Sequence, residues 1–316
     1  MREMNAVRAH RRGGPEQLVH EKAPCPRPGP GEVLVAVRAA SITAGELGWD
    51  ATWTDSLDGS GRDRTPIIPS HEFSGVVAAL GDDVTDWQAG DEVYGLIPFT
   101  MDGAAAEYAA VPADVVAAKP ESLTHDQAAA VPLAALTAWQ ALVDHGHLRR
   151  GRRVLVHGGA GGVGSFVVQI AAALGAEVAA TAAGRDLDFV RSLGADIAVD
   201  YAHDRFEDRV HDVDLVVDLV GGPTLDRSWQ VVRPGGTVVG IAAPPDAEEA
   251  ARHGARGVFF VVRPDRAGLR SITDLVEHGR LAPPIDRLLP LSQARAAYEA
   301  LEREHRRGKI VLQVSD

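Results

Sequence analysis

Cysteine is nearly absent from this chain, since Cys25 is the one thiol among 316 residues. A single thiol excludes an intrachain disulfide and a metal site built from several cysteines. Long apolar runs are also missing. No stretch approaches the roughly 18 residues of a membrane-spanning helix, and residues 1–5 are not followed by the hydrophobic segment of a secretory signal. We therefore expect a cytoplasmic protein with no membrane partner.

Positive charge is in deficit. Lys and Arg together number 32 against 44 Asp and Glu, which gives a formal net charge of -12. A protein this acidic does not suit a nucleic-acid backbone unless its basic residues are concentrated on one face. The basic clusters at 8–12, 149–153 and 303–307 are short, and we interpret them as solvated surface. We expect no nucleic-acid partner.

Glycine, in contrast, is plentiful with 33 residues, and one glycine-rich stretch is the most informative part of the chain. Residues 154–157 predict an apolar strand, residues 165–175 have the composition of a helix, and residues 177–181 predict a second strand. Between the first strand and the helix, three glycines have the spacing G-x-G-x-x-G: Gly159, Gly161 and Gly164.

In this spacing the first glycine permits a tight turn, and the second lets backbone N–H groups approach a pyrophosphate. The third lets the helix pack close to the strand, while the helix N-terminus favours the anion. The stretch predicts a dinucleotide-binding turn, and a glycine-rich turn without a ligand is the alternative. The residues expected to contact the dinucleotide are Gly159, Ala160, Gly161, Gly162, Val163 and Gly164.

The chain separates into regions of different pattern. Residues 1–123 contain short strands divided by Gly and Pro turns, which is typical of a β-rich, barrel-like domain. In residues 124–262 six strands alternate with helices, as a complete Rossmann sheet requires. The last strand, 309–314, is apolar and is expected to join the first sheet. The predicted fold is α/β, with a doubly wound parallel Rossmann sheet and a discontinuous β-barrel domain.

The expected strands of the first domain are 32–40, 73–80, 91–97 and 105–111, and those of the second are 154–157, 177–181, 197–200, 215–220, 237–241 and 257–262. Two helices are expected near the end, at 269–278 and 292–306. Residues 50–64 are polar and contain glycine, so we expect a mobile surface loop there.

Six short motifs extend the analysis beyond the glycine-rich turn. They occupy residues 29–35, 69–77, 90–95, 103–108, 160–169 and 308–312. In content and order the chain resembles the medium-chain dehydrogenases/reductases, specifically their zinc-independent quinone oxidoreductase-like branch. The resemblance implies a GroES-like catalytic domain, here residues 1–123 and 263–316, that clasps a Rossmann domain, here residues 124–262, with NADPH in the cleft.

The same resemblance bears on zinc. Zinc-dependent relatives bind a catalytic zinc with a cysteine, a histidine and usually a second cysteine. This chain retains only His71, because the first cysteine position falls near Thr43 or Ala44 and the later one near Leu133. Zinc needs three protein ligands for a catalytic site and four for a structural one. We therefore expect no metal.

Candidate catalytic residues under this resemblance are Thr43, His71 and Tyr94. The branch usually has an NPxD segment, in which Thr43 here replaces Asn and Glu46 replaces Asp. Thr43 is a candidate donor to a substrate carbonyl or to the nicotinamide ribose, and a turn hydroxyl satisfied by backbone is the alternative. Glu46 is expected to orient the loop. Trp49 and the nearby tryptophan at position 53 either cover a planar substrate or anchor the 50–64 loop.

The other two candidates have their own alternatives. An unperturbed histidine titrates near neutral pH, so His71 is a candidate proton relay. The alternative is a hydrogen-bonded histidine in a half-buried strand. Tyr94 is a candidate phenolic donor, and a residue that fills the core is the alternative.

The end of the second Rossmann strand indicates the cofactor. NAD enzymes place a carboxylate there for the ribose 2′-hydroxyl, whereas NADP enzymes supply a cation. Here Thr181 is followed by small residues and Arg185, which favours the 2′-phosphate of NADPH, with Asp186 and Asp188 just beyond. Four further residues are expected on the nicotinamide side: Val220, Ile241, Phe259 and Phe260.

These observations predict a zinc-independent, NADPH-dependent oxidoreductase that reduces a small molecule, a quinone or an α,β-unsaturated carbonyl, by hydride transfer. One alternative is an enoyl or carbonyl reductase that tailors a secondary metabolite. The other is an NADPH-binding redox sensor or accessory protein without turnover. The three lysines, Lys22, Lys119 and Lys309, lie outside the Rossmann half, which disfavours the Lys/Asp proton donor of polyketide-type enoyl reductases. The apolar strand 258–262 would be a bare edge, so we expect a homodimer.

Overall fold

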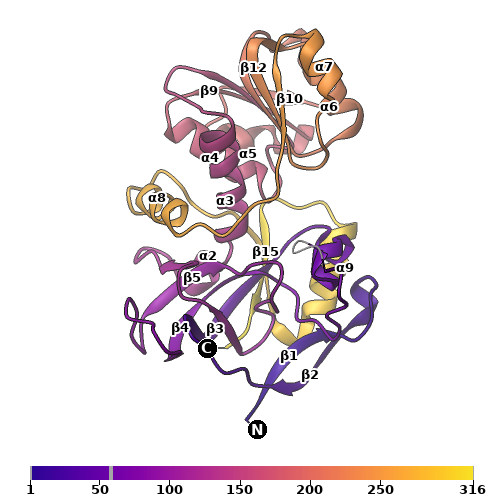
Figure 1. The fold of residues 1–316 in the computed structure, drawn as a ribbon. Coiled ribbons are helices and arrows are strands. Elements are labelled where there is room, and N and C mark those ends of the chain that lie inside the picture. The colour runs from indigo at the N-terminus through magenta and orange to yellow at the C-terminus, as the bar shows by residue number, and fades with distance from the viewer. Residues whose placement is uncertain (1, 57–59, 316) are drawn as a thin grey trace. The chain divides into compact units, whose positions relative to one another are not determined.

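The computed structural model describes residues 2–56 and 60–315. The chain forms two compact units. Unit 1 comprises residues 1–133, 263–273 and 283–316, and unit 2 comprises residues 134–262 and 274–282. Figure 1 shows the yellow C-terminal segment of unit 1 among its indigo N-terminal strands, so this unit is built from both ends of the chain.

Unit 2 is built on a six-stranded parallel sheet with the order β10-β9-β8-β11-β12-β13. The strands are β8 (Arg153–His157), β9 (Glu177–Ala182), β10 (Ile197–Asp200), β11 (Val213–Asp218), β12 (Val232–Gly240) and β13 (Arg256–Phe259). Counted from β8, this is the 3-2-1-4-5-6 order of a dinucleotide-binding Rossmann sheet, so the predicted doubly wound sheet is confirmed. The order reverses between β8 and β11, where such sheets bind ligands beyond their carboxyl ends.

The central strands of this sheet are apolar because both of their faces are covered. Residues 154–156 of β8 and 215–217 of β11 are at most 1% exposed. The connecting helices are α4 (Gly164–Ala173), α5 (Leu187–Ser192), α6 (Gly222–Ser228) and α7 (Ala247–Arg252), with 3-10 segments η5 (Gly184–Asp186) and η6 (Phe206–Asp208). α4 packs against β8 and β9, so its N-terminus lies at the end of β8.

Unit 1 contains a seven-stranded sheet with the order β14-β15-β3-β4-β5-β7, and β6 pairs with β3. Its strands are β3 (Glu32–Ile42), β4 (Glu72–Leu80), β5 (Glu92–Leu96), β6 (Tyr108–Pro112), β7 (Val116–Ala118), β14 (Ile285–Pro290) and β15 (Lys309–Gln313). β15 pairs antiparallel with β3, which confirms that the last strand joins the first sheet. This GroES-like sheet and the Rossmann sheet together confirm the predicted fold class.

Four strands were not predicted, among them the short strand β7. β1 (Glu3–Ala9) and β2 (Leu18–Pro24) form a separate antiparallel pair, and β14 extends the larger sheet in parallel to β15. Exposed and partly buried residues alternate along β14, so it has no continuous apolar run to mark it as a strand.

The helices of unit 1 include one that begins with a complete capping box. They are η1 (Pro15–Gln17), η2 (Glu46–Gly48), α1 (Asp50–Trp53), α2 (His125–Ala129), η7 (Leu291–Gln293) and α9 (Ala294–Arg303). Two further helices begin in unit 1 and continue into unit 2: α3 (Pro132–Trp139), which the π-helix η4 (Gln140–His145) extends, and α8 (Arg266–Glu277). Thr124 caps α2: its hydroxyl accepts from the N–H of Gln127, whose side chain accepts from the Thr124 N–H in return.

The two units divide at places that differ from the predicted boundaries. α2 packs against β3 and β4, so residues 124–133 lie in unit 1. Residues 274–282 lie in unit 2, because the side-chain amide of Gln169 on α4 both donates to and accepts from the backbone of Ala282, at 3.1 and 2.9 Å. Packing and hydrogen bonding across long sequence distances set these boundaries, and local pattern does not show them.

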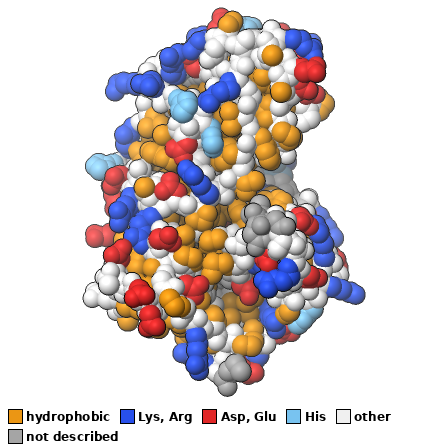
Figure 2. All heavy atoms as spheres, in the orientation of Figure 1, with side chains coloured by type: hydrophobic (Ala, Val, Ile, Leu, Met, Phe, Trp, Pro, Cys, Tyr) orange, Lys and Arg blue, Asp and Glu red, His pale blue; other side chains and the backbone are white. Residues whose placement is uncertain are grey.

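The surface carries charges of both signs. Figure 2 shows Lys and Arg interspersed with Asp and Glu on the face that it draws. Several form ion pairs, such as Arg153 with Glu177 at 3.0 Å and Arg191 with Asp188 at 2.8 Å. Exposed pairs of this kind contribute roughly 0–1 kcal/mol each to stability. Over residues 2–56 and 60–315, no helix is both long enough and apolar enough to cross a membrane.

Candidate functional site

The turn between β8 and α4 follows the glycine pattern with one correction. Gly158, not Gly159, is the turn residue in the left-handed region, with a φ of 78°. Gly159 is required by packing instead, because a Cβ there would lie 2.9 Å from the Cβ of Ala180 on β9. At Gly164 a Cβ would lie 2.0 Å from the carbonyl oxygen of Gly158. The third glycine therefore has the predicted packing role.

Gly161 differs from these glycines, because the fold itself does not require it. The nearest heavy atom to a Cβ at Gly161 would be the carbonyl oxygen of Gly158 at 3.4 Å, an ordinary van der Waals contact, and φ there is outside the left-handed region. A glycine at this position fits the close approach of backbone to a pyrophosphate at the N-terminus of α4. The turn therefore fits a bound dinucleotide.

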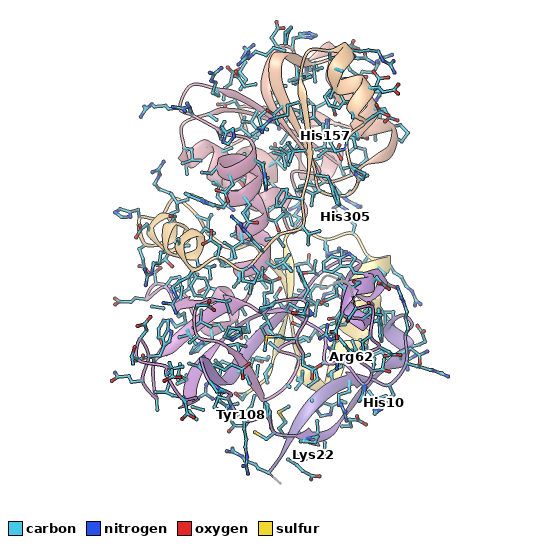
Figure 3. The ribbon with its side chains drawn as sticks, viewed as in Figure 1. His10, Lys22, Arg62, Tyr108, His157 and His305 are labelled. Atoms are coloured by element: carbon cyan, nitrogen blue, oxygen red, sulfur yellow. The ribbon has the colours of Figure 1, made fainter. Side chains whose placement is uncertain are left out.

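A series of hydrogen-bonded, buried side chains supports the turn. The hydroxyl of Thr181 accepts from the N–H of Gly158 at 3.2 Å and lies 3.2 Å from Nδ1 of His157. Nε2 of His157 lies 3.1 Å from Oγ of Ser228 at the end of α6. Figure 3 labels His157 among the strands of unit 2. Thr181 is thus a residue that positions the turn. His157 and Ser228 were not predicted, since they are 71 positions apart in sequence.

His157 makes the stability of the chain depend on pH. Burial, and then the nearby guanidinium of Arg227, lower the pKa of His157 from 6.5 to about 3. Between pH 6.5 and 3, His157 is therefore protonated in the unfolded chain and neutral in the folded chain. The free energy of unfolding falls as the pH drops through this range. We predict that His157→Gln lowers the dependence of the unfolding free energy on pH by about 1.4 kcal/mol per unit. Urea titrations between pH 4 and 7 measure this, and an unchanged slope contradicts it.

Three of the remaining cofactor candidates are exposed near the carboxyl ends of the Rossmann strands. Arg185 lies in η5, directly after β9. Val220 follows β11 and is 54% exposed, and Phe259 ends β13 and is 47% exposed. Large apolar side chains so exposed are available to a ligand or a partner.

Ile241 and Phe260 are less accessible. The N–H of Ile241 donates to the carbonyl of Asp218 at 2.8 Å, which joins the ends of β12 and β11. Phe260 packs against the ring of His145, with centroids 4.4 Å apart. The predicted strand 257–262 ends at Phe259, so Phe260 lies beyond the sheet.

In unit 1, Thr43 belongs to a buried polar cluster. Its hydroxyl accepts from Nζ of Lys309 at 3.2 Å, and the same ammonium lies 2.5 Å from Oε1 of Glu72. Lys309 is 4% exposed and Glu72 is fully buried. The other oxygen of Glu72 accepts from the N–H of Leu133 at 2.9 Å. Thr43 and Leu133, the positions where cysteine ligands would fall, thus contact a buried ion pair.

Glu46 fixes the backbone on the other side of Thr43. Its carboxylate accepts from the N–H of Thr43 at 2.9 Å, from the N–H of Ser70 at 3.2 Å and from the phenol of Tyr298 at 2.6 Å. Burial raises the pKa of Glu46, against these hydrogen bonds and the charge of Lys309. The carboxyl thus ties the Thr43 loop to the chain before β4 and to α9, as expected of a residue that orients the loop.

The burial and the pKa of His71 differ from those expected of a proton relay. It is 2% exposed, and burial, followed by the charge of Arg64, lowers its pKa to about 3 despite a hydrogen bond to the backbone of Ile97. The ring is neutral at physiological pH, so the expected titration near neutrality is wrong, because the imidazole is enclosed. Its Nδ1 has no hydrogen-bond partner, and the ring meets Phe99 edge-on with centroids 5.1 Å apart.

The residues around His71 do not fit a zinc ion. Glu72, the next residue in sequence, is paired with Lys309. Where the structure describes the chain, no group of three or more His, Cys, Asp or Glu side chains is arranged to hold a metal. A catalytic zinc needs three such ligands.

Tyr94 lies inside unit 1. It is fully buried, its hydroxyl donates to the carbonyl of Leu269 at 2.9 Å, and it lies 2.7 Å from Oγ1 of Thr273. Both partners are on α8. This geometry supports the alternative in which Tyr94 fills the core, here by joining β5 to α8.

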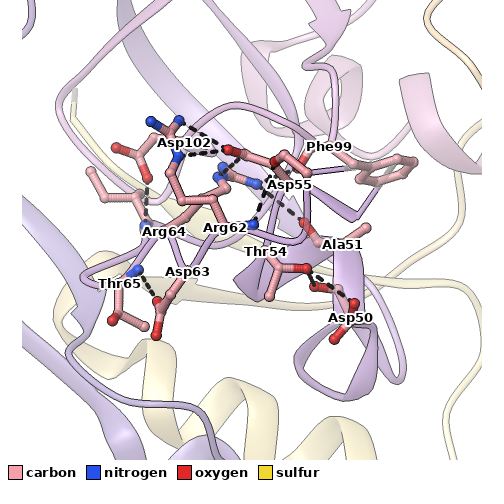
Figure 4. A network of polar contacts seen from close by, with 12 residues as sticks. Asp50, Ala51, Thr54, Asp55, Arg62, Asp63, Arg64, Thr65, Phe99 and Asp102 are labelled. Carbon is pink, nitrogen blue, oxygen red and sulfur yellow. Dashed lines mark hydrogen bonds and ion pairs between the residues drawn. The ribbon is translucent and has the colours of Figure 1, made fainter. Parts of the chain in front are cut away.

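Ion pairs and hydrogen bonds to the largely buried side chains of Asp55 and Arg64 hold the 50–64 loop where the structure describes it, and residues 57–59 lie outside the described residues. Nε of Arg62 donates to the carboxylate of Asp55 at 2.9 Å, and Asp55 is 5% exposed. Arg64 donates to two backbone carbonyls, as Figure 4 shows. These contacts fix both ends of the loop.

The two tryptophans of this region have different roles. Trp53 is 2% exposed and its indole N–H donates to the carbonyl of Leu47 at 2.9 Å, so it anchors the loop. Trp49 is half-buried and meets Phe99 edge-on, with centroids 5.7 Å apart. Its ring belongs to the same aromatic group as Phe99 and His71.

A Rossmann sheet whose turn fits a dinucleotide occurs here in one chain with a GroES-like sheet that encloses a polar cluster, a combination typical of dinucleotide-dependent oxidoreductases. Two family models match the chain. "Alcohol dehydrogenase GroES-like domain" covers residues 29–121, and "Zinc-binding dehydrogenase" covers residues 193–312.

Individual proteins agree with this class. The quinone oxidoreductase of Coxiella burnetii has the same fold with a TM-score of 0.90 and 32% identity, over 99% of this chain and 100% of that one. The "Probable zinc-binding oxidoreductase, mitochondrial" of Arthroderma benhamiae is 33% identical over 92% of this chain and 91% of its own length. The chloroplastic "NADPH-dependent alkenal/one oxidoreductase" of Arabidopsis thaliana is 36% identical over 78% of this chain and 64% of its own length.

The chain therefore belongs to the medium-chain dehydrogenase/reductase superfamily and to its quinone oxidoreductase-like branch, which confirms the resemblance seen in the motifs. It is an oxidoreductase of the quinone and alkenal reductase type. Two of the relatives are named as mitochondrial and chloroplastic, and a cytoplasmic location for this chain stays a prediction.

Proposed function

We propose that this protein is an NADPH-dependent, zinc-free reductase of quinones or α,β-unsaturated carbonyls. The observation that carries the proposal is Gly161, a glycine that the fold does not require, at the N-terminus of a Rossmann helix. Bound there, NADPH supplies a hydride to the substrate. The substrate classes are those in the names of the quinone oxidoreductase and the alkenal/one oxidoreductase to which the chain is similar.

In this proposal, residues of the chain stabilise the charge that develops on the substrate. Hydride addition to a conjugated carbonyl places negative charge on its oxygen, and a positioned donor stabilises that charge. We assign this donor role to the hydroxyl of Thr43, since Lys309 and Glu46 fix its side chain and backbone. Water supplies the proton, because His71 is neutral and enclosed.

The proposal excludes zinc because of the donor set. His71 is the one residue retained from the expected ligands, and its neighbour in sequence, Glu72, is paired with the ammonium of Lys309. An ammonium paired with Glu72 repels a dication that would bind the same carboxylate. Elemental analysis of the purified protein tests this, and stoichiometric zinc that survives dialysis against a chelator contradicts it.

NADPH is favoured over NADH by the surroundings of Arg185. Of the two carboxylates just after it, Asp186 is fully buried and Asp188 is paired with Arg191. Asp200, at the end of β10, lies close to Gly184 and accepts from His203 at 2.7 Å, which compensates its charge.

We predict that Arg185→Ala raises the KM for NADPH about 10- to 100-fold and leaves the KM for NADH within about twofold. The reason is the loss of a charged hydrogen bond to the 2′-phosphate, which contributes about 1.5–3 kcal/mol. Steady-state kinetics with both cofactors measure the ratio. Arg191→Ala, whose cation is paired with Asp188, is the matched control. Equal changes for the two cofactors would contradict the assignment.

NADPH oxidation with a panel of quinones, enones, enoyl thioesters and simple ketones tests the proposal as a whole. Turnover of quinones or enones supports it. Preference for enoyl thioesters or simple ketones points instead to a tailoring reductase. Tight NADPH binding without oxidation across the panel points to a sensor or accessory protein.

The edge strand of unit 2 leads to a prediction on assembly. Among the described strands β13 pairs with β12 alone, and Phe259 and Val261 near its end are 47% and 55% exposed. We predict a homodimer that pairs these edges, because a bare apolar edge associates readily. Sedimentation at micromolar concentration should show a dimer that Val261→Asp weakens. Val19→Asp, at a similarly exposed valine of unit 1, should have no effect. A wild-type monomer would refute the prediction.

A further inference from the structure

Lys309 makes three polar contacts, as many as its ammonium has protons. Nζ lies 3.0 Å from the carbonyl oxygen of Ile42, 3.2 Å from Oγ1 of Thr43 and 2.5 Å from Oε1 of Glu72. The side chain is almost fully buried, so water does not complete or replace these contacts. With two hydrogen bonds, one ion pair and almost no exposed surface, the ammonium is not open to a substrate, and any effect on catalysis passes through one of these three partners.

Thr43 is the partner through which such an effect can reach a substrate. Ile42 contributes a backbone carbonyl and Glu72 is fully buried, whereas Thr43 is half-buried and is followed by the exposed residues Ala44 and Gly45. A hydroxyl has one proton to donate and two lone pairs. Because one lone pair accepts from the ammonium, the hydroxyl proton stays available for another acceptor. The ammonium that donates to this oxygen also polarises the O–H bond of Thr43 and makes the hydroxyl a stronger hydrogen-bond donor.

The rest of the cluster holds this arrangement rigid. Glu72 keeps the ammonium in place and is itself fixed by the N–H of Leu133. Glu46 fixes the N–H of Thr43 and is in turn held by Tyr298. The hydroxyl is thus preorganised before a substrate arrives, which is the condition under which a donor contributes most to a reaction.

We propose that Lys309 is a positioning residue for the reduction, which orients and polarises the hydroxyl of Thr43 as the donor to the substrate oxygen, with Glu72 as its fixed counter-ion. The inference rests on the proposed function. It explains why one of only three lysines is buried at this place, and it assigns the positive charge of the site to a side chain that never touches the substrate.

A double-mutant cycle tests this coupling. Lys309→Met alone would leave Glu72 buried without a counter-ion, so Lys309→Met is combined with Glu72→Gln, which still accepts from Leu133. This charge-free pair is compared with wild type in two backgrounds, Thr43 and Thr43→Val. In the Thr43 background we expect kcat/KM to fall about 10-fold or more, as for loss of a charge-assisted hydrogen bond. In the Thr43→Val background the same change should alter kcat/KM by less than about twofold.

Controls separate this role from a structural one. Lys119 has a side chain that is 6% exposed, an ion pair with Glu92 and hydrogen bonds to two backbone carbonyls, so Lys119→Met removes a similarly buried lysine away from Thr43. It should keep kcat/KM within about twofold of wild type. Thr43→Ser keeps the hydroxyl and should restore the dependence on Lys309. Thermal unfolding shows that each variant is folded.

The outcomes are distinct. Should the charge-free pair not fold, Lys309→Arg takes its place, because a planar guanidinium cannot repeat the three contacts, and its loss of kcat/KM must likewise vanish with Thr43→Val. Equal losses in both backgrounds overturn the inference and leave the proposed function standing. A wild-type protein that oxidises NADPH with no compound of the panel overturns the proposed function, and the inference falls with it.

Discussion

Gly161→Ala is expected to weaken NADPH binding on the order of 30-fold while the protein stays as stable as the wild type. A Cβ at Gly161 meets the protein only at ordinary contact distance, so the fold accepts it. The same methyl group occupies the space in which backbone must approach the pyrophosphate. A 30-fold rise in Kd corresponds to about 2 kcal/mol. Fluorescence titration with NADPH and thermal unfolding measure the two quantities.

Gly164→Ala is the matched control, and its stability result should be the opposite. Its Cβ would lie 2.0 Å from the carbonyl oxygen of Gly158, so backbone must shift, at a cost of about 3 kcal/mol. The melting temperature should fall by roughly 5 °C. If Gly161→Ala binds NADPH as the wild type does, the turn is not the dinucleotide site and the proposed function loses its main support.

Thr43→Val is expected to lower kcat with the best quinone or enone substrate about 100-fold. Valine has nearly the shape of threonine but offers no hydroxyl, and one donor to a developing oxyanion contributes a factor of about 100 to 1000 in kcat. Titration with NADPH separates this loss from a loss of cofactor binding. Steady-state and single-turnover kinetics measure the change.

The same substitution leaves one N–H of Lys309 without its acceptor, which costs about 1–3 kcal/mol of stability. Assays are therefore run well below the melting temperature of the variant, and Thr43→Ser, which keeps the hydroxyl, should retain most of the activity. A variant with kcat within about twofold of wild type would show that the hydroxyl plays no part in the reaction.

Where the sequence pattern was local, it predicted the structure well. The six Rossmann strands and the return of strand 309–314 to the first sheet each follow from hydrophobic periodicity within a few residues. β14 and the β1–β2 pair were missed because their apolar pattern is weak and pairing alone stabilises them. The identity of the turn glycine was missed by one position, because spacing does not show which glycine has the positive φ.

The site was less predictable than the fold. Thr43 was a candidate from its motif, but Lys309, 266 residues away, was known only as part of a closing motif. His71 was expected to titrate near neutral pH, and enclosure in the fold lowers its pKa to about 3 instead. Tyr94 was a candidate donor to a substrate, but its hydroxyl is hydrogen-bonded to residues of α8. In each case the deciding contact or burial joins distant parts of the chain.

The sequence by itself determined that this chain contains a dinucleotide turn, a Rossmann sheet and a second sheet built from both ends, because glycine spacing and hydrophobic periodicity act over short distances. Only the tertiary structure decided which polar groups share a buried site. Burial and the pairing of Lys309 with Glu72 and Thr43 depend on strands β15, β4 and β3 meeting in one sheet. That meeting sets the charge, the hydrogen bonds and the proposed chemistry of the cluster.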